Sequence, residues 1–325
     1  MKNKLMVLAF LASMSATSYA DVKAVQAALD VDDAVLAQTE FNALSAEEKS
    51  DISGRVLKGQ LLLVNDEPED AFDYFEALQE KHEDNVDVNY YLGVSAVIMA
   101  QKASIFSKLS YAKDFIKAME RTVVLKPDHQ DALNTLIGFH LNAPGIAGGD
   151  SDKALVYAKQ LQQYDAEQGY SQIANVYWQT EKAELAQQTI TDGLVKYPES
   201  GTLYFARAMA SITAETWEQA RADLIFAAKY AKDDEKKGEA LYQQGKVSVK
   251  SGAEAELGID ALTQALPLAG ERYLPWVNYR LAQLYLTQKD QIKANEVIAK
   301  IDVSEDDDLE DKVKKLKKEL KKLMG

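Results

Sequence analysis

A pattern of small and bulky residues recurs along the chain and predicts a fold built from pairs of helices. A small residue is followed four positions later by an apolar residue, and three positions after that by another apolar or small residue. This spacing places all three on one face of a helix, with the small residue where a second helix must come close. The copies are Ala71, Phe75, Leu78; Ala154, Ala158, Leu161; Ala186, Ile190, Gly193; Ala220, Leu224, Ala227; Gly258, Leu262, Ala265; and Ala294, Ile298, Ile301.

A second small residue lies on the helix that precedes each of these six copies, and Gly93 is its equivalent on one further helix. The series is Gly59, Gly93, Gly138, Ala174, Ala208, Gly245 and Ala282. Gly59 and Gly93 are 34 residues apart, as are Ala174 and Ala208, while the step from Gly93 to Gly138 is 45 residues. Repeats of this length indicate helix–turn–helix units that bury their apolar faces by stacking on their neighbours. We therefore expect an all-α chain with about seven repeats between residues 53 and 302.

Several short motifs stand at matching positions of different units. They are Leu92-Gly93, Ala174 with Tyr177, Leu281-Ala282 with Tyr285, and Pro127 and Pro198 at the ends of two units. With these motifs the chain resembles the tetratricopeptide repeat (TPR) family, as an exported bacterial member. The resemblance implies an α-solenoid of tandem repeats whose inner helices line a concave groove. It also implies a non-enzymatic scaffold that binds a segment of a protein partner there; the alternative is glycan binding, or a role as an accessory subunit of an envelope enzyme.

Both ends of such an array need a cover, because a terminal repeat has one face without a neighbour. Residues 21–52 do not match the repeat and are predicted to form an N-terminal helical cap. Residues 303–325 are predicted to form a charged capping helix, since acids crowd its first turns and lysines its last. A short coiled-coil dimer handle is the alternative for this segment, and the oligomeric state is left open. The apolar stripe of the helix consists of Leu309, Val313, Leu316, Leu320 and Leu323.

The first twenty residues have the pattern of a secretory signal peptide. Lys2 and Lys4 form a basic start, an apolar core follows, and Ser18-Tyr19-Ala20 is a cleavage site, which predicts a mature chain beginning at Asp21. We therefore expect a periplasmic protein. No later apolar run reaches the ~20 residues that a membrane span needs, and the chain contains no cysteine that could carry a lipid or form a disulfide.

The charge balance of the chain is acidic. Without Lys2 and Lys4, 35 of the 37 Lys and Arg residues remain against 51 Asp and Glu residues, a net charge of −16. Nucleic acids and anionic membrane surfaces both select for a basic footprint, so this balance argues against both as partners. We expect a protein or peptide partner and no nucleic acid.

The segment Ala143–Ser151 gathers a proline and three glycines between two predicted helices. We expect a structural turn in which Asp150 or Ser151 caps the next helix, although contact with a partner or ligand is left open. A phosphate-binding loop would need a preceding strand and a hydroxyl residue after Lys153, and neither is present. The turn also resembles an insert of some exported bacterial members of the family.

No pattern of residues indicates catalysis or metal binding. His82, His129 and His140 are spaced too widely for a zinc site, and no cysteine can join them. Nucleophile-elbow, triad and dinucleotide motifs are absent from the sequence. We expect no catalytic residue, no cofactor and no metal.

The repeat register predicts which residues face the groove. The residue three positions before each inner small residue, and the residue just after it, should point into the groove. Aromatic side chains recur there with little charge between them, which suits anchors of a bound partner. Packing between helices is the alternative role for each of these aromatics. The predicted groove residues are Tyr90, Phe139, Asn175, Phe205, Tyr242 and Tyr279.

Overall fold

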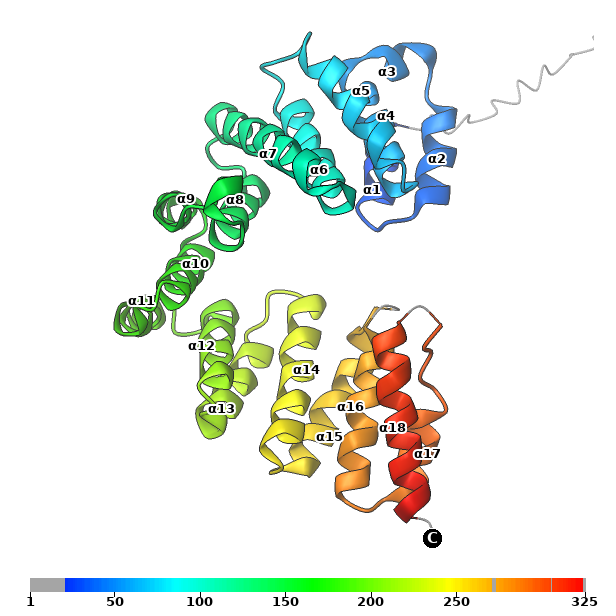
Figure 1. The fold of residues 1–325 in the computed structure, drawn as a ribbon, viewed down its shortest axis with the longest axis vertical. Helices are drawn as coiled ribbons and strands as arrows, with labels where there is room; N and C mark the ends of the chain where they lie inside the picture. The colour runs from blue at the N-terminus through cyan, green and yellow to red at the C-terminus, as the bar shows by residue number, and fades with distance from the viewer. Residues whose placement is uncertain (1–20, 271–272, 305, 324–325) are drawn as a thin grey trace, which may run out of the picture. The chain divides into compact units, whose positions relative to one another are not determined.

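The computed structural model describes residues 21–270, 273–304 and 306–323, and in these ranges the regular structure is helical (Figure 1). The prediction of an all-α chain is therefore confirmed. The predicted signal peptide, residues 1–20, lies outside the described residues. None of the described helices is both long and apolar enough to cross a bilayer.

The described chain forms two compact units. One contains the residues up to Ala132 together with Ile146–Gly148, and the other contains Leu133–Gly145 and the residues from Gly149 onward. The first unit holds α1 (Val22–Leu29), α2 (Ala34–Ala43), α3 (Ala46–Ser50), α4 (Ile52–Val64), α5 (Pro68–Gln79), α6 (Val86–Lys102), α7 (Ile105–Leu125) and the start of α8 (Gln130–Asn142).

The second unit continues the succession of helix pairs. Here α9 packs on α10, α10 on α11 and α12, α12 on α13, and the order continues through α14, α15, α16 and α17. Besides the rest of α8, it holds α9 (Ser151–Tyr164), α10 (Ala166–Gln179), α11 (Ala183–Lys196), α12 (Gly201–Thr213), α13 (Trp217–Lys229), α14 (Asp234–Ser251), α15 (Ala255–Ala265), α16 (Leu274–Thr287), α17 (Gln291–Ile298) and α18 (Asp307–Leu323).

Five turns inside helix pairs are closed by the same backbone hydrogen bond. A backbone N–H donates to the carbonyl oxygen five residues earlier at 2.8 to 3.0 Å, as from Glu67 to Leu62 and from Thr216 to Ser211. The residue before each donor is left-handed, with φ between 56° and 61°. This is the Schellman motif, in which glycine is usual at the left-handed position. The residues at that position here are Asp32, Asp66, Glu181, Glu215 and Lys289.

The small residues of the inner helices lie where a neighbouring side chain comes close. A Cβ atom on Gly59 would lie 2.2 Å from Cζ of Phe75, and one on Gly245 would lie 2.2 Å from Cγ of Leu262. Phe75 and Leu262 belong to the small-and-bulky pattern, so the predicted close approach is confirmed at both sites. Gly138 differs, because no atom lies within 4 Å of the position of its missing Cβ.

This difference predicts opposite effects of the same substitution at equivalent positions. Gly245→Ala is expected to lower the free energy of unfolding by roughly 1–3 kcal/mol, because Leu262 must move away. Gly138→Ala is expected to raise it by roughly 0.5–1 kcal/mol, since alanine restricts the unfolded helix segment and meets open space. Denaturant titration followed by circular dichroism measures both. If Gly245→Ala instead raised the free energy of unfolding, α14 and α15 would be able to move apart at this contact at little cost.

The long step between Gly93 and Gly138 comes from longer helices. The α6 and α7 helices have 17 and 21 residues, whereas α4 and α5 have 13 and 12. The extra residues therefore extend the helices of this pair, and only Ala103 and Ser104 separate them.

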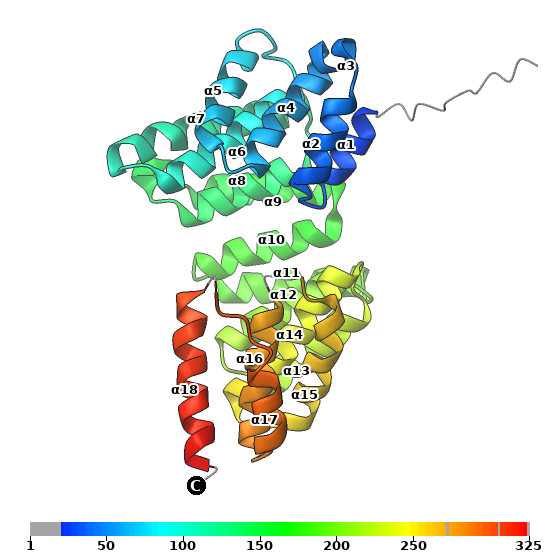
Figure 2. The ribbon, with the colours of Figure 1, turned by 90° about the vertical axis from the view of Figure 1, so that its right-hand side faces the viewer.

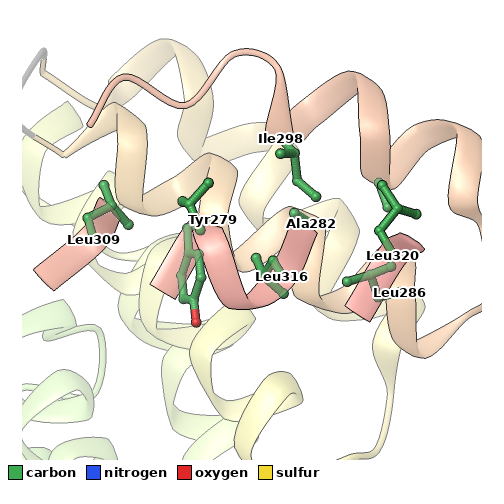
Figure 3. Packing of buried hydrophobic residues seen from close by; sticks show 9 residues of the cluster. Tyr279, Ala282, Leu286, Ile298, Leu309, Leu316 and Leu320 are labelled. Carbon is green, nitrogen blue, oxygen red and sulfur yellow. The ribbon is translucent and has the colours of Figure 1, made fainter. Parts of the chain in front are cut away.

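Helix α18 lies beside the last helix pair (Figure 2), and its apolar stripe packs against that pair (Figure 3). Leu309, Val313, Leu316 and Leu320 are buried together with residues of α16 and α17. Leu323, the last member of the predicted stripe, is 42% exposed. At the other end, α1 and α2 share a core with Leu57 and Leu61 of α4. The exact limits of caps and repeats, 21–52, 53–302 and 303–325, stay predictions.

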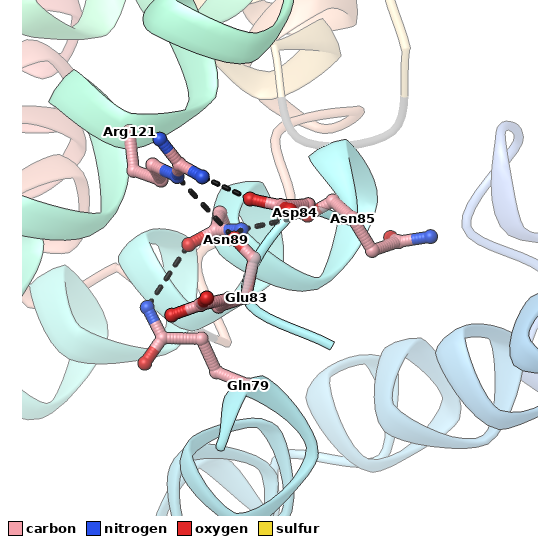
Figure 4. A network of polar contacts seen from close by, with 6 residues as sticks. All are labelled: Gln79, Glu83, Asp84, Asn85, Asn89 and Arg121. Carbon is pink, nitrogen blue, oxygen red and sulfur yellow. Dashed lines mark hydrogen bonds and ion pairs between the residues drawn. The ribbon is translucent and has the colours of Figure 1, made fainter. Parts of the chain in front are cut away.

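A buried asparagine fixes the turn between α5 and α6 (Figure 4). Asn89 is fully buried. Its Oδ1 accepts from Nε2 of Gln79 at 2.9 Å, and its Nδ2 donates to the carbonyl oxygens of Glu83 and Asn85 at 2.9 and 2.7 Å. Because each of these bonds satisfies a group that would otherwise be buried without water, the network holds the turn in one conformation.

One ion pair joins the two helices of the α12–α13 pair in the core. Arg207 donates to both carboxylate oxygens of Asp223, with Nε–Oδ2 and Nη2–Oδ1 distances of 2.8 and 2.6 Å. Asp223 is 1% exposed. The hydrogen bonds to Asp223 raise the pKa of the Arg207 guanidinium above its usual range. A two-point pair of this kind fixes the relative position of the two helices.

Candidate functional site

A cavity of about 1110 Å³ lies between α10, α11 and α12 in the second unit, and we call it the α10–α12 pocket. Its walls come from both helices of one pair and from the first helix of the next. It rests on a core in which Ala174, Ala186, Ile190 and Leu203 are buried. Because alanines let α10 and α11 approach closely, the larger side chains on their remaining faces form the walls.

Carboxamide side chains recur in this lining. Gln179 donates from Nε2 to Oδ1 of Asn175 at 3.3 Å, which leaves Nδ2 of Asn175 available to a ligand. Gln188 donates to Asp192 at 2.8 Å on the α11 wall. Carboxamides offer donors and acceptors together, so they pair with peptide groups or with hydroxyl groups. The five carboxamide residues are Gln172, Asn175, Gln179, Gln187 and Gln188.

The rest of the polar lining is almost uncharged. Hydroxyl groups come from serines and threonines of α10, α11 and α12, among them Ser171 and Thr191. Of the lining residues that the structure describes, Glu184 is the single one with an ionisable side chain. In a chain in which 27% of residues are charged, this pocket therefore offers hydrogen bonds and apolar contact with little net charge.

Large apolar side chains complete the lining. Phe205 and Met209 of α12 are half-buried against the core of the α12–α13 pair, and Trp178 of α10 is half-buried against the core beneath the pocket. Each therefore has one side fixed by packing and another side turned to the pocket. Rigid aromatic side chains held in this way are typical anchors for a bound partner.

Some of the residues predicted to face the groove lie together in the structure. Asn175 and Phe205 line the same pocket, and so do Ser171 and Met209, the residues predicted beside them in the repeat register. The smaller cavity between α13, α14 and α15, about 360 Å³, contains none of the predicted groove residues. The α10–α12 pocket is therefore the candidate site.

Tyr279 departs from the prediction. It is 7% exposed and lies in the core between α16 and α18, where Leu309 and Leu316 flank it (Figure 3). The physical reason is that α18 covers the face of α16 on which an exposed groove residue would lie. Tyr279 thus serves helix packing, the alternative role considered for these aromatics.

The remaining predicted residues are half-buried and lie outside the pocket. Tyr242 packs on the core of the α14–α15 pair with the ammonium of Lys246 6.0 Å from its ring centre, and Phe139 lies edge-on to His140. Tyr90 belongs to the first unit, where it stacks on His129. Their role in binding stays a prediction.

The second helix of the pair contributes residues that the repeat register did not predict. Glu184, Gln187 and Gln188 of α11 form one wall, and Trp178 lies three residues after Asn175 on α10. The repeat register predicts groove positions on the inner helices alone. The density of carboxamides between residues 172 and 188 is the signal that could have indicated this wall.

Burial lowers the pKa of His129, beneath Tyr90, and the charge of nearby Lys126 lowers it further, while Asp131 and Asp87 oppose this shift. The rings of His129 and Tyr90 lie 4.7 Å apart, and Nδ1 of His129 accepts from the N–H of Ala132 at 3.3 Å. Protonation of Nδ1 would break this hydrogen bond, and it would place a positive charge at the N-terminus of α8, which is the positive end of the helix dipole.

The first unit is therefore expected to lose stability in mild acid. Since the folded pKa of His129 lies below its unfolded value of about 6.5, the unfolded chain takes up the proton first. Stability should be constant above about pH 6.5 and fall as the pH drops toward the folded pKa. Melting temperatures of the wild type and of His129→Asn, which keeps a capping side chain, measure this contribution. If the melting temperature of His129→Asn falls with decreasing pH as much as that of the wild type, the loss of stability in acid comes from other groups.

The glycine-rich segment Ala143–Ser151 forms a structural turn, as predicted. A Cβ atom on Gly149 would lie 1.7 Å from the carbonyl oxygen of Ala143, so the turn needs glycine there. Asp150 caps α9 by accepting from the N–H groups of Asp152 and Lys153 at 3.0 and 3.2 Å. Its carboxylate thus occupies the helix N-terminus that a phosphate would need. The described residues contain no group of His, Cys, Asp or Glu side chains arranged to hold a metal ion.

Comparisons with known proteins bear on the fold. The sequence matches no family model, and no curated protein is significantly similar to it. A tetratricopeptide repeat protein from Parabacteroides merdae has a TM-score of 0.52 at 12% identity, over 81% of this chain and 96% of that chain. A monomeric mutant of IFIT1 with the capped RNA m7Gppp-AAAA has a TM-score of 0.51 at 15% identity, over 93% of this chain and 72% of that chain. Similarity at these identities shows a TPR-like fold, which confirms the predicted fold class.

Proposed function

Because the chain has the fold of tetratricopeptide repeat proteins, we propose that it is a non-enzymatic binding module that takes up a segment of another protein in the α10–α12 pocket. The observation that carries this proposal is the lining of the pocket, which joins carboxamides to the fixed apolar side chains of Phe205 and Met209. The carboxamides suit the peptide groups of an extended segment, and the apolar side chains suit its side-chain anchors.

The nearly uncharged lining also selects the kind of segment. A charged side chain that entered the pocket would lose its hydration and find Glu184 as the one charged residue of the lining, a large cost without a paired charge. We therefore expect the bound segment to present uncharged polar and apolar side chains. The acidic net charge of the chain further disfavours an acidic partner.

The same lining gives a specific reason to keep a second candidate. Hydroxyl-rich sugars also pair with carboxamides and stack on aromatic side chains such as Trp178, so a neutral glycan of the cell envelope fits the pocket chemistry. In both versions the place of action is the bacterial periplasm. That location rests on the signal-peptide pattern of residues 1–20.

Site-specific photo-crosslinking in the producing cell tests this function. Benzoylphenylalanine at Gln187, on the α11 wall, should form an adduct whose partner is identified by mass spectrometry. The same probe at Val195, which is exposed on α11 and outside the pocket lining, is the matched control. A protease-sensitive adduct at Gln187 alone supports a protein partner, and a glycosidase-sensitive adduct supports the glycan.

A pocket variant makes the test specific. Asn175→Ala with Phe205→Ala, in the protein that carries the probe at Gln187, should abolish the adduct while the circular dichroism spectrum is kept. An adduct of the same intensity in this variant, or equal adducts from Gln187 and Val195, would refute the assignment of the pocket.

A further inference from the structure

From Lys314 onward, one face of helix α18 is made almost entirely of lysine, whereas Asp307, Glu310 and Asp311 lie on the same side of its first turns. Its apolar stripe is buried against α16 and α17. At 3.6 residues per turn, six lysines fall within an arc of about 160° on the opposite side of the helix. These side chains are exposed, and from Lys314 to Lys322 the one other exposed residue is Glu319. We call them the lysine face: Lys314, Lys315, Lys317, Lys318, Lys321 and Lys322.

Most of this positive charge has no partner among the residues that the structure describes. Lys314 pairs with Glu310 at 3.0 Å, and Lys312, beside the face, pairs with Asp308. The other five lysines of the face form no ion pair with a described residue. Residues 312–323 contain seven lysines and one glutamate, a net charge of +6, whereas the rest of the chain from Asp21 carries −22. A net positive charge is therefore concentrated in the C-terminal part of this helix, after the acidic residues of its first turns.

We propose that the lysine face binds the surface of an anionic phospholipid membrane. Clusters of four to eight lysines on an amphipathic helix have this chemistry, because each ammonium is attracted to lipid phosphates near the surface. Two features favour a lipid surface over a protein. Lysine is depleted in protein interfaces, and such interfaces need an apolar or aromatic core. The lysine face has no such core, and its flexible point charges suit a fluid layer of phosphates.

The burial of the apolar stripe defines how the helix meets the membrane. Leu309, Val313, Leu316 and Leu320 hold α18 on the protein and are not free to enter the acyl layer. Binding is therefore electrostatic, reversible and sensitive to salt, unlike that of an amphipathic helix that inserts its apolar side. The acidic remainder of the chain is repelled, but this repulsion is screened beyond roughly 8 Å at physiological ionic strength.

Vesicle co-sedimentation tests the proposal. The protein is purified from the producing cell, so that it has the N-terminus that it has there. The vesicles contain equal parts of phosphatidylglycerol and phosphatidylcholine, or phosphatidylcholine alone. We expect binding to the anionic vesicles at about 50 mM NaCl, release at about 0.5 M NaCl, and none to the neutral vesicles. The variant Lys317→Glu, Lys318→Glu, Lys321→Glu, Lys322→Glu should bind more than about 100-fold more weakly.

The control has the same change in net charge at lysines that are exposed elsewhere. It combines Lys159→Glu, Lys182→Glu, Lys250→Glu and Lys300→Glu. Binding that is retained by this control and lost by the α18 variant supports the proposal. If the fourfold glutamate variant fails to fold, the same four lysines are changed to glutamine instead.

Two outcomes would overturn the proposal: equal loss of binding in the α18 variant and the control, or no binding to anionic vesicles. The lysine face would then serve another anionic partner such as an acidic protein. The pocket variants Asn175→Ala and Phe205→Ala should bind vesicles like the wild type, so failure of this proposal is separate from failure of the proposed function.

Discussion

Truncation of the chain after Asp302 is expected to lower the melting temperature by about 5 °C or more, and to cause association of the protein. Without α18, the buried residues Tyr279, Leu286 and Ile298 face water. Four buried side chains of α18 lose their packing as well, each worth about 1.5–3 kcal/mol, partly offset by the conformational entropy that 17 helical residues regain. Differential scanning calorimetry and light scattering measure the two effects.

The effect should begin at the C-terminal end, because stability in stacked repeats is a sum of local terms. Hydrogen exchange should speed up first in α16 and α17. Leu316→Ala should reproduce part of the loss, about 2–4 kcal/mol, while Lys318→Ala on the exposed side should be nearly neutral. An unchanged melting temperature combined with the loss of a dimer would instead support the coiled-coil alternative for this segment.

Arg207→Met is expected to destabilise the second unit by about 3 kcal/mol, because it leaves the buried carboxylate of Asp223 without its partner. Both bonds of the pair, at 2.8 and 2.6 Å, are lost at once. Arrays of repeats often unfold in several steps, so hydrogen exchange in α12 and α13 is a better measure than one global transition.

An exposed ion pair provides the matched control. Lys314 and Glu310 lie 3.0 Å apart with side chains 60% and 44% exposed, so Glu310→Gln should cost less than about 0.5 kcal/mol. The double variant Arg207→Met with Asp223→Leu should recover much of the stability, since it removes the buried charge itself. If Arg207→Met costs no more than Glu310→Gln, the carboxylate of Asp223 is hydrated or protonated in the variant.

The fold could be predicted because its determinants lie close together in the sequence. The pattern Ala71, Phe75, Leu78 and the position of Gly59 describe a contact between two helices that are joined by one turn. Contacts of this kind recur with the period of the repeat, so the sequence shows them several times. Gly138 shows the limit of the argument, because the same register position lacks the same neighbour.

The candidate site could be predicted in part, for a related reason. The register puts Asn175 of α10 and Phe205 of α12 on faces that line one pocket, and their role in binding stays a prediction. It could not predict the fate of Tyr279, since the helix that covers this residue begins 28 positions later and follows no repeat pattern. The α11 wall was missed because a repeat pattern describes what is common to all pairs, whereas the cluster of carboxamides belongs to one pair.

Net charge was the least informative of the sequence properties. A value of −16 describes the chain from Asp21 onward as a whole, but the seven lysines between Lys312 and Lys322 lie on one helix with a buried apolar side. The distance over which charges act in salt solution is about 8–10 Å, less than the length of α18. A partner that meets this helix therefore responds to a local charge of opposite sign.

The five Schellman turns have a consequence for how the chain can vary. Their closing bonds join backbone groups, so the turn keeps its shape whichever side chain stands at its left-handed position. Aspartate, glutamate and lysine all occur there, at a cost of roughly 1 kcal/mol relative to glycine, and all are exposed. The tips of these turns are thus exchangeable surface sites. Substitution there can alter what the protein displays to its surroundings while the helix pairs, and the pocket between them, keep their geometry.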